Sequence, residues 1–449
     1  MNGIAAPPVQ VATDLWAEVD RRLGLGEPPA ADTERRVPIQ TRRRRGYDAL
    51  QHASRAQLAL VDDEGLLRWS YSPPATGLPR RRAARAGLAD FGQPLLRYFF
   101  GATAGSEAPR GLGPNRLTQA LLALDAKLTP AQGLRQWSAA TQRLSAVSAP
   151  VCAGPTLLLI HGTFSHSEMF FEQLATTDPG RELLAQLGTR YRHILAFDHA
   201  TLSVAPWLNA LDLHAELRRV SGPIDVVCHS RGGLVASWLL RLAPVPARKV
   251  VFVGSPLGGT SLASPHALRG ALDRLASVAN ALALGGAALG TVLPLALGAA
   301  GLAKVFATSL SLAAAAPLAD AALAMVPGLA SQQRTHDNQE TARLFNQAWL
   351  ARPALYAVRA NFEPDTSLPI WRFWARLKNA PVAALDGLAD LVFEGANDLV
   401  VDTGSMDYLG QPALARMAQT LDLGPDSQTW HTSYFRDPQV VAFLGAKLL

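Results

Sequence analysis

The feature that most constrains this chain is a series of short, uninterrupted apolar runs that starts near residue 150. Residues 156–160 read Thr-Leu-Leu-Leu-Ile, and similar runs occur at 194–197, 224–228, 250–253, 354–358 and 391–393. Such runs are typical of strands that are buried on both faces. Segments with helical patterning separate them, at 179–188, 206–219, 231–243 and 337–350. This alternation predicts the α/β class, with a mostly parallel sheet and helices on both of its faces.

One of these strands runs into a serine that is followed directly by a helix. Residues 226–236 read Val-Val-Cys-His-Ser-Arg-Gly-Gly-Leu-Val-Ala, so Ser230 stands at the apex of the turn. In a strand–nucleophile–helix elbow, the sharp turn exposes the serine hydroxyl above the sheet. Gly232 is small, as the close packing of strand and helix requires, and Cys228 stands where glycine is usual. The pattern predicts a nucleophilic serine, although by itself it also fits an ordinary strand-to-helix turn.

A second strand ends in a segment suited to stabilise a negatively charged oxygen. Residues 157–166 read Leu-Leu-Leu-Ile-His-Gly-Thr-Phe-Ser-His, and Gly162 gives the backbone freedom to turn an N–H towards a reacting carbonyl. We predict that the backbone N–H groups of Thr163 and Arg231 are the two donors of an oxyanion hole. Two further residues are predicted to contact substrate: Phe164, next to Thr163, and His229, next to Ser230.

An acid and a base follow later in the chain. Asp398 lies in the loop after the run at 391–393, and His431 lies shortly before a C-terminal helix. Nucleophile, acid and base thus occur in the chain order of the hydrolase fold. His431 would take the proton of Ser230, and Asp398 would fix the imidazole tautomer. Asp402, in the same loop, stays the alternative acid, and His161 is interpreted as structural.

With these motifs, residues from about 150 to 449 resemble the α/β-hydrolase superfamily. The resemblance lies within its lipase-like branch, which includes bacterial triacylglycerol lipases and GPI-inositol-deacylase-like proteins. Two further segments carry it, at 197–203 and 253–263. It implies an α/β-hydrolase domain at 151–449, in which the insertion at 264–335 occupies the position of a lid. It also implies a serine hydrolase that cleaves carboxylic esters through an acyl-enzyme.

The insertion at 264–335 is strongly apolar. Residues 275–303 carry no charge and consist mostly of Ala, Leu, Gly and Val. Length alone makes this stretch a candidate for a membrane span, but its glycines and its place between two predicted strands favour an apolar helical cap. A membrane-dipping hairpin and ordinary core helices are the alternatives. A cap of this kind would cover an acyl chain, so we expect a lipid ester as substrate and contact with a membrane surface.

The first 150 residues differ from the rest in charge. They hold 20 Lys and Arg against 13 Asp and Glu, with arginine runs at 42–45 and 80–82. We interpret them as a basic N-terminal accessory region, with a hairpin over 58–71 and helical residues at 115–147. The arginines are interpreted as a solvated face, with contact to acidic lipid head groups as the alternative. Nucleic acid is not expected as a partner, because no aromatic residues are interleaved with them.

Residues that the sequence lacks exclude several classes of protein. Two cysteines, with no Cys-x-x-Cys and no His-Glu-x-x-His motif, predict neither a disulfide framework nor a metal site. The phosphate-binding loop of P-loop NTPases is missing, and no cofactor is predicted. The N-terminus lacks the pattern of a secretory signal, so a cytoplasmic location is expected, with membrane association as the alternative. Acyl transfer, amide hydrolysis and a membrane-associated effector on a hydrolase scaffold stay open beside ester hydrolysis.

Overall fold

The computed structural model describes residues 18, 21, 56–63, 66–72, 93–100, 114–147, 150, 152–263, 296–302, 305, 326–335, 338–363, 396–410, 415–426 and 428–449. The arginine runs, the strand predicted at 391–393 and most of the insertion at 264–335 lie outside these ranges. No helix within them combines the length and the apolar character that a membrane crossing requires. The chain divides into two compact units, one of residues 1–127, 268–323 and 366–388, the other of residues 128–267, 324–365 and 389–449.

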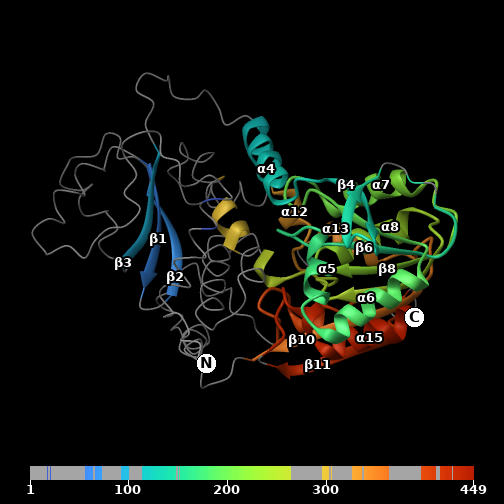
Figure 1. The fold of residues 1–449 in the computed structure, drawn as a ribbon. Coiled ribbons are helices and arrows are strands. Elements are labelled where there is room, and N and C mark those ends of the chain that lie inside the picture. Colours follow the sequence, from blue (N-terminus) through green and yellow to red (C-terminus); the bar gives the residue numbers. More distant parts are fainter. Residues whose placement is uncertain are drawn as a thin grey trace, which may run out of the picture. The chain divides into compact units, whose positions relative to one another are not determined.

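The first unit contains a three-stranded antiparallel sheet in the order β2-β1-β3 (Figure 1). The antiparallel pairing of β1 with β2 confirms the hairpin that the sequence predicts. Residues 296–302 of the apolar insertion are helical. Gly301 in this segment packs closely against Leu124, since a Cβ at the glycine would lie 2.6 Å from a methyl carbon of the leucine. The named elements of this unit are β1 (Ala56–Asp63), β2 (Leu66–Ser72), β3 (Gln93–Phe100) and α4 (Pro114–Leu128).

The second unit is built on an eight-stranded sheet in the order β5-β4-β7-β6-β8-β9-β10-β11. The six strands from β7 to β11 in this order run parallel to their neighbours. β4 is antiparallel to both β5 and β7. The mostly parallel sheet predicted from the apolar runs is therefore confirmed.

The strands of this sheet are β4 (Gly133–Ser138), β5 (Arg143–Ala146), β6 (Thr156–Ile160), β7 (His193–Asp198), β8 (Ile224–His229), β9 (Ala247–Val253), β10 (Ala354–Phe362) and β11 (Gln419–Asp426). The α-helices of the unit are α5 (Glu168–Leu174), α6 (Asp178–Arg190), α7 (Pro206–Leu217), α8 (Gly232–Leu242), α12 (Pro327–Ala330), α13 (Gln339–Phe345) and α15 (Pro438–Leu448). Short 3₁₀ turns are η2 (Ser261–Ala263), η5 (Thr403–Ser405) and η6 (Tyr434–Arg436).

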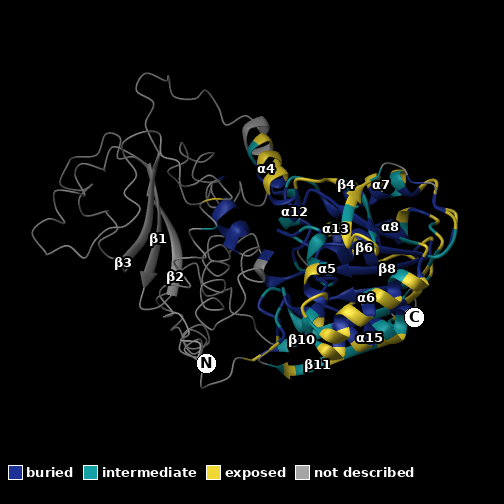
Figure 2. Cartoon of the chain, in the orientation of Figure 1, coloured by how far each residue is buried: buried dark blue, intermediate teal, exposed yellow. Residues whose placement is uncertain are grey.

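Helices cover both faces of the large sheet, as Figures 1 and 2 show. Successive residues of β6 alternate between two apolar clusters. Leu158 and Ile160 pack with residues of α7, α8 and α13. Leu157 and Leu159 pack with residues of α5, α6 and α15 on the other face. Because both faces are buried, β6 has no polar alternation, which is why it reads as one continuous apolar run.

The prediction of helix for residues 115–147 is wrong beyond the end of α4. Residues 133–146 form the β4–β5 hairpin at one side of the large sheet, so this sheet begins before residue 150. The buried apolar residues of β4, Leu134 and Trp137, are three positions apart, a spacing that one face of a helix also shows. In the strand they point to opposite faces, because Leu134 belongs to one apolar cluster and Trp137 to the other.

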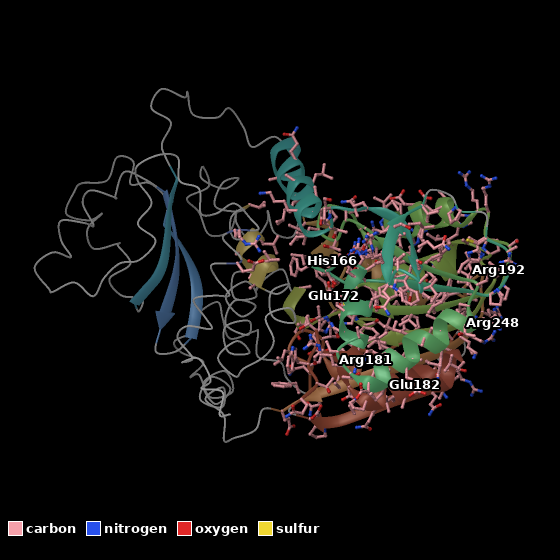
Figure 3. All side chains as sticks on the ribbon, in the orientation of Figure 1. His166, Glu172, Arg181, Glu182, Arg192 and Arg248 are labelled. Atoms are coloured by element: carbon pink, nitrogen blue, oxygen red, sulfur yellow. The ribbon has the colours of Figure 1, made fainter. Side chains whose placement is uncertain are left out.

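Side chains cap the N-termini of three helices of this unit, α6, α13 and α15. In α6 the side chain of Thr177 accepts a hydrogen bond from the Gly180 N–H at 3.2 Å, which satisfies one of the first amides of the helix. Leu183 of this helix is buried against the sheet. Arg181 and Glu182 extend away from it, as Figure 3 shows. The apolar face of such a helix covers the sheet, and its opposite face presents charged side chains to solvent.

Candidate active site

The candidate nucleophile occupies a strained turn between β8 and α8. Ser230 follows the last residue of β8 and has φ +53°, a left-handed conformation that residues other than glycine rarely adopt. Its N–H donates to the carbonyl oxygen of Val253 at 3.0 Å, which ties the turn to the neighbouring strand β9. The structure thus has the sharp strand-to-helix elbow that residues 226–236 predict.

Small residues let the elbow approach its surroundings. A Cβ at Gly162 would lie 2.5 Å from the Cβ of Ser230, and a Cβ at Gly232 would lie 2.3 Å from the carbonyl oxygen of Ile160. Neither position therefore accepts a side chain without a shift of the backbone. Cys228 is fully buried among apolar residues. Its size fits the position where the elbow more often has glycine.

The three residues predicted as nucleophile, base and acid form one chain of hydrogen bonds. Nε2 of His431 lies 2.8 Å from Oγ of Ser230. Nδ1 of the same ring lies 2.7 Å from Oδ2 of Asp398. All three side chains are buried. With the parallel sheet and the elbow, the chain order Ser230, Asp398, His431 is that of the α/β-hydrolase fold, so the predicted fold class is confirmed.

The buried carboxylate of Asp398 accepts four hydrogen bonds. Its Oδ1 accepts from the N–H groups of Val400 and Val401, at 3.1 and 2.8 Å. Its Oδ2 accepts from His431 and from the hydroxyl of Tyr434, at 2.7 and 2.8 Å. Burial and the charge of Asp398 raise the pKa of Tyr434 well above its usual value, so the phenol stays protonated and donates. Tyr434 could not be predicted from the sequence, because nothing in the residues around it distinguishes it from an ordinary core aromatic.

The loop that carries His431 is held from two sides. Nε2 of His229 lies 2.7 Å from the carbonyl oxygen of His431, and a nitrogen facing a carbonyl must be the donor. Gln173 of α5 donates to the carbonyl oxygen of Thr432 at 2.8 Å and accepts from the N–H of Phe435 at 3.2 Å. Burial and nearby His431 lower the pKa of His229 well below its usual value. These contacts make His229 a support of the loop, and its contact with substrate stays a prediction.

Asp402, the alternative acid, has other partners. Its carboxylate accepts from the N–H and the hydroxyl of Ser261, at 3.0 and 2.7 Å, and lies 3.6 Å from the guanidinium of Arg334. Ser261 and Arg334 stand at the two ends of the apolar insertion. Asp402 therefore joins the start and the end of the insertion, while Asp398 is the carboxylate at the imidazole.

The predicted oxyanion loop has the geometry of a strained, anchored turn. Phe164 has φ +58°, is buried, and directs its N–H to the hydroxyl of Thr201 at 3.4 Å. The N–H of Thr163 has no acceptor among the described residues. Its hydroxyl accepts from Nε2 of Gln332 at 3.1 Å, which ties the loop to the segment after α12. The contact of Phe164 with substrate stays a prediction.

Arg231, the second predicted donor, directly precedes α8. Its amide lies where the N-terminus of a helix carries partial positive charge. Its side chain is fully buried and donates to Oδ1 of Asn209 at 2.9 Å and to the carbonyl oxygen of Val204. The guanidinium thus fastens the start of α8 to α7 and to the loop before it, and the amide next to Ser230 is held in place.

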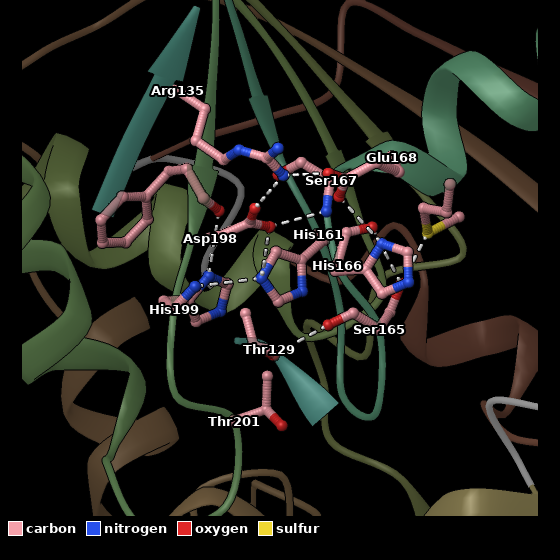
Figure 4. Close-up of polar contacts among 12 residues, drawn as sticks. Thr129, Arg135, His161, Ser165, His166, Ser167, Glu168, Asp198, His199 and Thr201 are labelled. Atoms are coloured by element: carbon pink, nitrogen blue, oxygen red, sulfur yellow. Dashed lines mark hydrogen bonds and ion pairs between the residues drawn. The ribbon is translucent and has the colours of Figure 1, made fainter. Parts of the chain in front are cut away.

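A polar network lies beside the oxyanion loop (Figure 4). Asp198, at the end of β7, accepts from the N–H of Ser167 at 2.6 Å and pairs with Arg135 at 3.0 Å. Arg135 also pairs with Glu168, and Glu168 accepts from His166 at 3.0 Å. Burial opposes ionisation of Glu168, but the hydrogen bonds from His166 and Arg135 outweigh it and lower its pKa to about 2. The network fixes the backbone that follows the oxyanion loop.

His161 belongs to the same region and is structural. Its Nδ1 donates to the carbonyl oxygen of Gly162 at 2.8 Å, and its Nε2 accepts from the N–H of His199 at 3.1 Å. Both contacts together require a neutral ring with its proton on Nδ1. Burial, which the charge of Asp198 counters only in part, lowers the pKa of His161. Among the described residues, no three His, Cys, Asp or Glu side chains are placed to share a metal ion.

A comparison with known proteins gives a family for this chain but no reaction. A family model described as "Domain of unknown function (DUF7379)" matches residues 126–449. None of the curated proteins matches the chain. Because one fold hosts many reactions, the chemistry has to be inferred from the site itself.

Three of the solved structures that are similar to this chain are the following. The mature Bacillus licheniformis lipase BlEst2 is 16% identical, with a TM-score of 0.35, over 68% of this chain and 96% of the lipase. The Cif epoxide hydrolase from Acinetobacter nosocomialis is 14% identical, with a TM-score of 0.36, over 78% of this chain and 100% of that one. An alpha/beta hydrolase fold protein from Nakamurella multipartita is 18% identical, with a TM-score of 0.31, over 70% and 99%.

Proposed function

Because the chain belongs to the family described as "Domain of unknown function (DUF7379)", whose description names no activity, we propose its function from the geometry of the site. We propose that it is a serine hydrolase that cleaves carboxylic esters. The observation that carries this proposal is the buried chain from Ser230 through His431 to Asp398, with distances of 2.8 and 2.7 Å.

The first half of the reaction forms an acyl-enzyme. Because Nδ1 of His431 donates to Asp398, Nε2 is unprotonated and accepts the proton of the Ser230 hydroxyl. The serine oxygen then attacks the ester carbonyl, and negative charge develops on the carbonyl oxygen. The amides of Thr163 and Arg231 would stabilise that charge, a contribution of about 3 kcal/mol for each donor. Collapse of the intermediate breaks the bond to the alcohol, which leaves with the proton held by His431.

The second half returns the enzyme to its starting state. A water molecule gives a proton to Nε2 of His431 and attacks the acyl carbon. The same two amides stabilise the second tetrahedral intermediate. When this intermediate collapses, the carboxylic acid leaves and Ser230 regains its proton from His431. No cofactor takes part in these steps.

The proposed substrate class is a lipid ester. The insertion that stands between residues 264 and 335 is strongly apolar in sequence. Its two ends are joined by Asp402 through Ser261 and Arg334, and its C-terminal part carries Gln332, which holds Thr163. An apolar segment whose end is anchored beside the oxyanion loop favours esters of fatty acids over esters of polar acids.

The test is a series of p-nitrophenyl esters from acetate to palmitate, with the matching anilides beside them. The proposal predicts ester hydrolysis that prefers medium or long acyl chains, and a loss of about 10⁶-fold in kcat for Ser230→Ala. Cleavage of anilides but not of esters would make the protein an amidase. Equal rates in wild type and Ser230→Ala would contradict the proposed mechanism.

A further inference from the structure

Tyr434 holds a place in the site that the triad mechanism does not require. It lies in η6, three residues after His431, and is fully buried. Its hydroxyl donates at 2.8 Å to Oδ2 of Asp398, the same oxygen that accepts from His431 at 2.7 Å. Two donors therefore share one carboxylate oxygen, and one of them is the proposed base.

The backbone near Tyr434 is shaped to allow this contact. Gly254, directly after β9, has φ +53°. A Cβ there would lie 2.6 Å from the ring of Tyr434 and 3.2 Å from Oδ2 of Asp398. A larger residue at this position would therefore separate the phenol from the carboxylate. The site thus combines a glycine that makes room with a phenol that fills it.

We infer that Tyr434 is a positioning residue that weakens the hold of Asp398 on protonated His431 and so extends activity to lower pH. This inference rests on the proposed function. A hydrogen bond from a phenol draws electron density from Oδ2, which leaves less of it for the imidazolium. Without the phenol, His431 would keep its proton at higher pH. Protonated His431 cannot accept the proton of Ser230, so activity would begin at a higher pH.

The titratable and charged groups that face this set come from several elements. His229 faces it, with ring centroids 4.9 Å from His431 and 6.2 Å from Tyr434. Burial lowers the pKa of His229, so its ring is neutral in the range of interest. On the loop of Asp398, the carboxylate of Asp402 faces Ser261. On η6 itself, the charge of Arg436 interacts with Glu172.

The chain offers a matched control for the loss of a buried phenol. Tyr191 is buried and donates to Oδ2 of Asp225 at 2.7 Å. Asp225 stands near the start of β8, about 17 Å along the strand from Ser230 at about 3.3 Å per residue. Tyr191→Phe therefore removes the same kind of hydrogen bond far from the site. Both variants lose stability, and only Tyr434→Phe should change the pH dependence.

The experiment measures kcat/KM for p-nitrophenyl butyrate against pH in wild type, Tyr434→Phe and Tyr191→Phe. The expected result is that the midpoint of the acidic limb rises by about 0.5–1 pH unit in Tyr434→Phe alone. A replacement that preserves the ring, Tyr434→3-fluorotyrosine, strengthens the donor and should lower the midpoint, which keeps the test valid if Tyr434→Phe does not fold. Unchanged midpoints in both Tyr434 variants would overturn the inference.

A second measurement separates this inference from the proposed function. The titration of the His431 ring is followed by NMR of ring-labelled histidine and assigned with His431→Asn. It needs no substrate. If the wild type hydrolyses no ester, the proposed function fails. The effect of Tyr434 on protonated His431 is then tested by itself: it is supported if the titration midpoint of His431 rises in Tyr434→Phe and falls with 3-fluorotyrosine, and it is refuted if the midpoints coincide.

Discussion

Replacing Asp398 by Asn tests whether the site depends on this particular carboxylate. Each of the two carboxylate oxygens of Asp398 accepts two hydrogen bonds. In Asp398→Asn the NH₂ group of the new amide replaces one of these oxygens, so it faces two donors in either orientation. The N–H groups of Val400 and Val401 cannot become acceptors. The phenol of Tyr434 can rotate its proton away, and His431 can move its proton to the other nitrogen. The NH₂ group will therefore take the place of Oδ2 and donate to Nδ1 of His431.

This orientation disables the base without moving it. His431 then carries its proton on Nε2, which faces Ser230, so this nitrogen cannot accept the proton of the Ser230 hydroxyl. In serine-protease triads the same substitution lowers kcat about 10⁴-fold with the geometry preserved, and we expect a loss of that order here. Asp402→Asn differs, because an amide can still accept from the N–H of Ser261 and donate to its hydroxyl. We expect it to change kcat/KM by less than about 10-fold.

The assay compares initial rates on p-nitrophenyl butyrate for wild type, Asp398→Asn and Asp402→Asn. Circular dichroism and urea unfolding confirm that each variant is folded. A folded Asp398→Asn that keeps kcat within about tenfold of wild type would show that His431 does not depend on the Asp398 carboxylate. A loss in Asp402→Asn as large as that in Asp398→Asn would contradict the different roles of the two carboxylates.

Three further predictions follow from buried groups and close contacts. Burial lowers the pKa of three histidines, so as the pH falls the unfolded chain takes up protons at these rings before the folded protein does. The free energy of unfolding should therefore decrease below about pH 6.5, by up to about 1.4 kcal/mol per pH unit for each ring. Urea unfolding at pH 6.5 and 5.5 measures this decrease, and equal free energies at the two pH values would contradict it. These histidines are His161, His199 and His229. Gly162→Ala places a Cβ 2.5 Å from that of Ser230. We therefore expect kcat/KM to fall about 100-fold, while the midpoint of urea unfolding decreases only modestly. An unchanged kcat/KM would mean that the oxyanion loop does not approach the elbow. Gln332→Leu and Thr163→Val should each lower kcat about tenfold and their combination no further, while additive losses in the double-mutant cycle would show that the two side chains act separately.

The central strands and the residues of the hydrogen-bonded chain could be predicted because their constraints are local. A strand buried on both faces must be apolar throughout, and the elbow must have small residues next to Ser230. The hairpin of β4 and β5 could not be predicted, since Leu134 and Trp137 repeat with the spacing of a helix. β11 also escaped prediction, because Leu421 and Leu423 are the only hydrophobic residues among its eight and none of the eight is fully buried.

The supports of the site depend on contacts between distant parts of the chain. Gln173 reaches the His431 loop across about 260 positions in the sequence, and no local pattern records that contact. Asp398 and Asp402 occupy the same loop with similar neighbours, so the sequence could rank them but not separate their roles. Their partners distinguish them, His431 and Tyr434 for one and Ser261 and Arg334 for the other.

An activated Ser230 is tested most directly by labelling the folded protein with a fluorophosphonate probe, followed by mass spectrometry of its peptides. Such probes react with serines that are activated by a neighbouring base. Ser237 is a matched control, because it is buried in α8 and its hydroxyl has no hydrogen-bond partner among the described residues. We predict one labelled peptide, which contains Ser230, with labelling retained in Ser237→Ala and lost in Ser230→Ala and His431→Asn. A folded wild type that takes no label, or one whose label persists in Ser230→Ala, would contradict an activated Ser230.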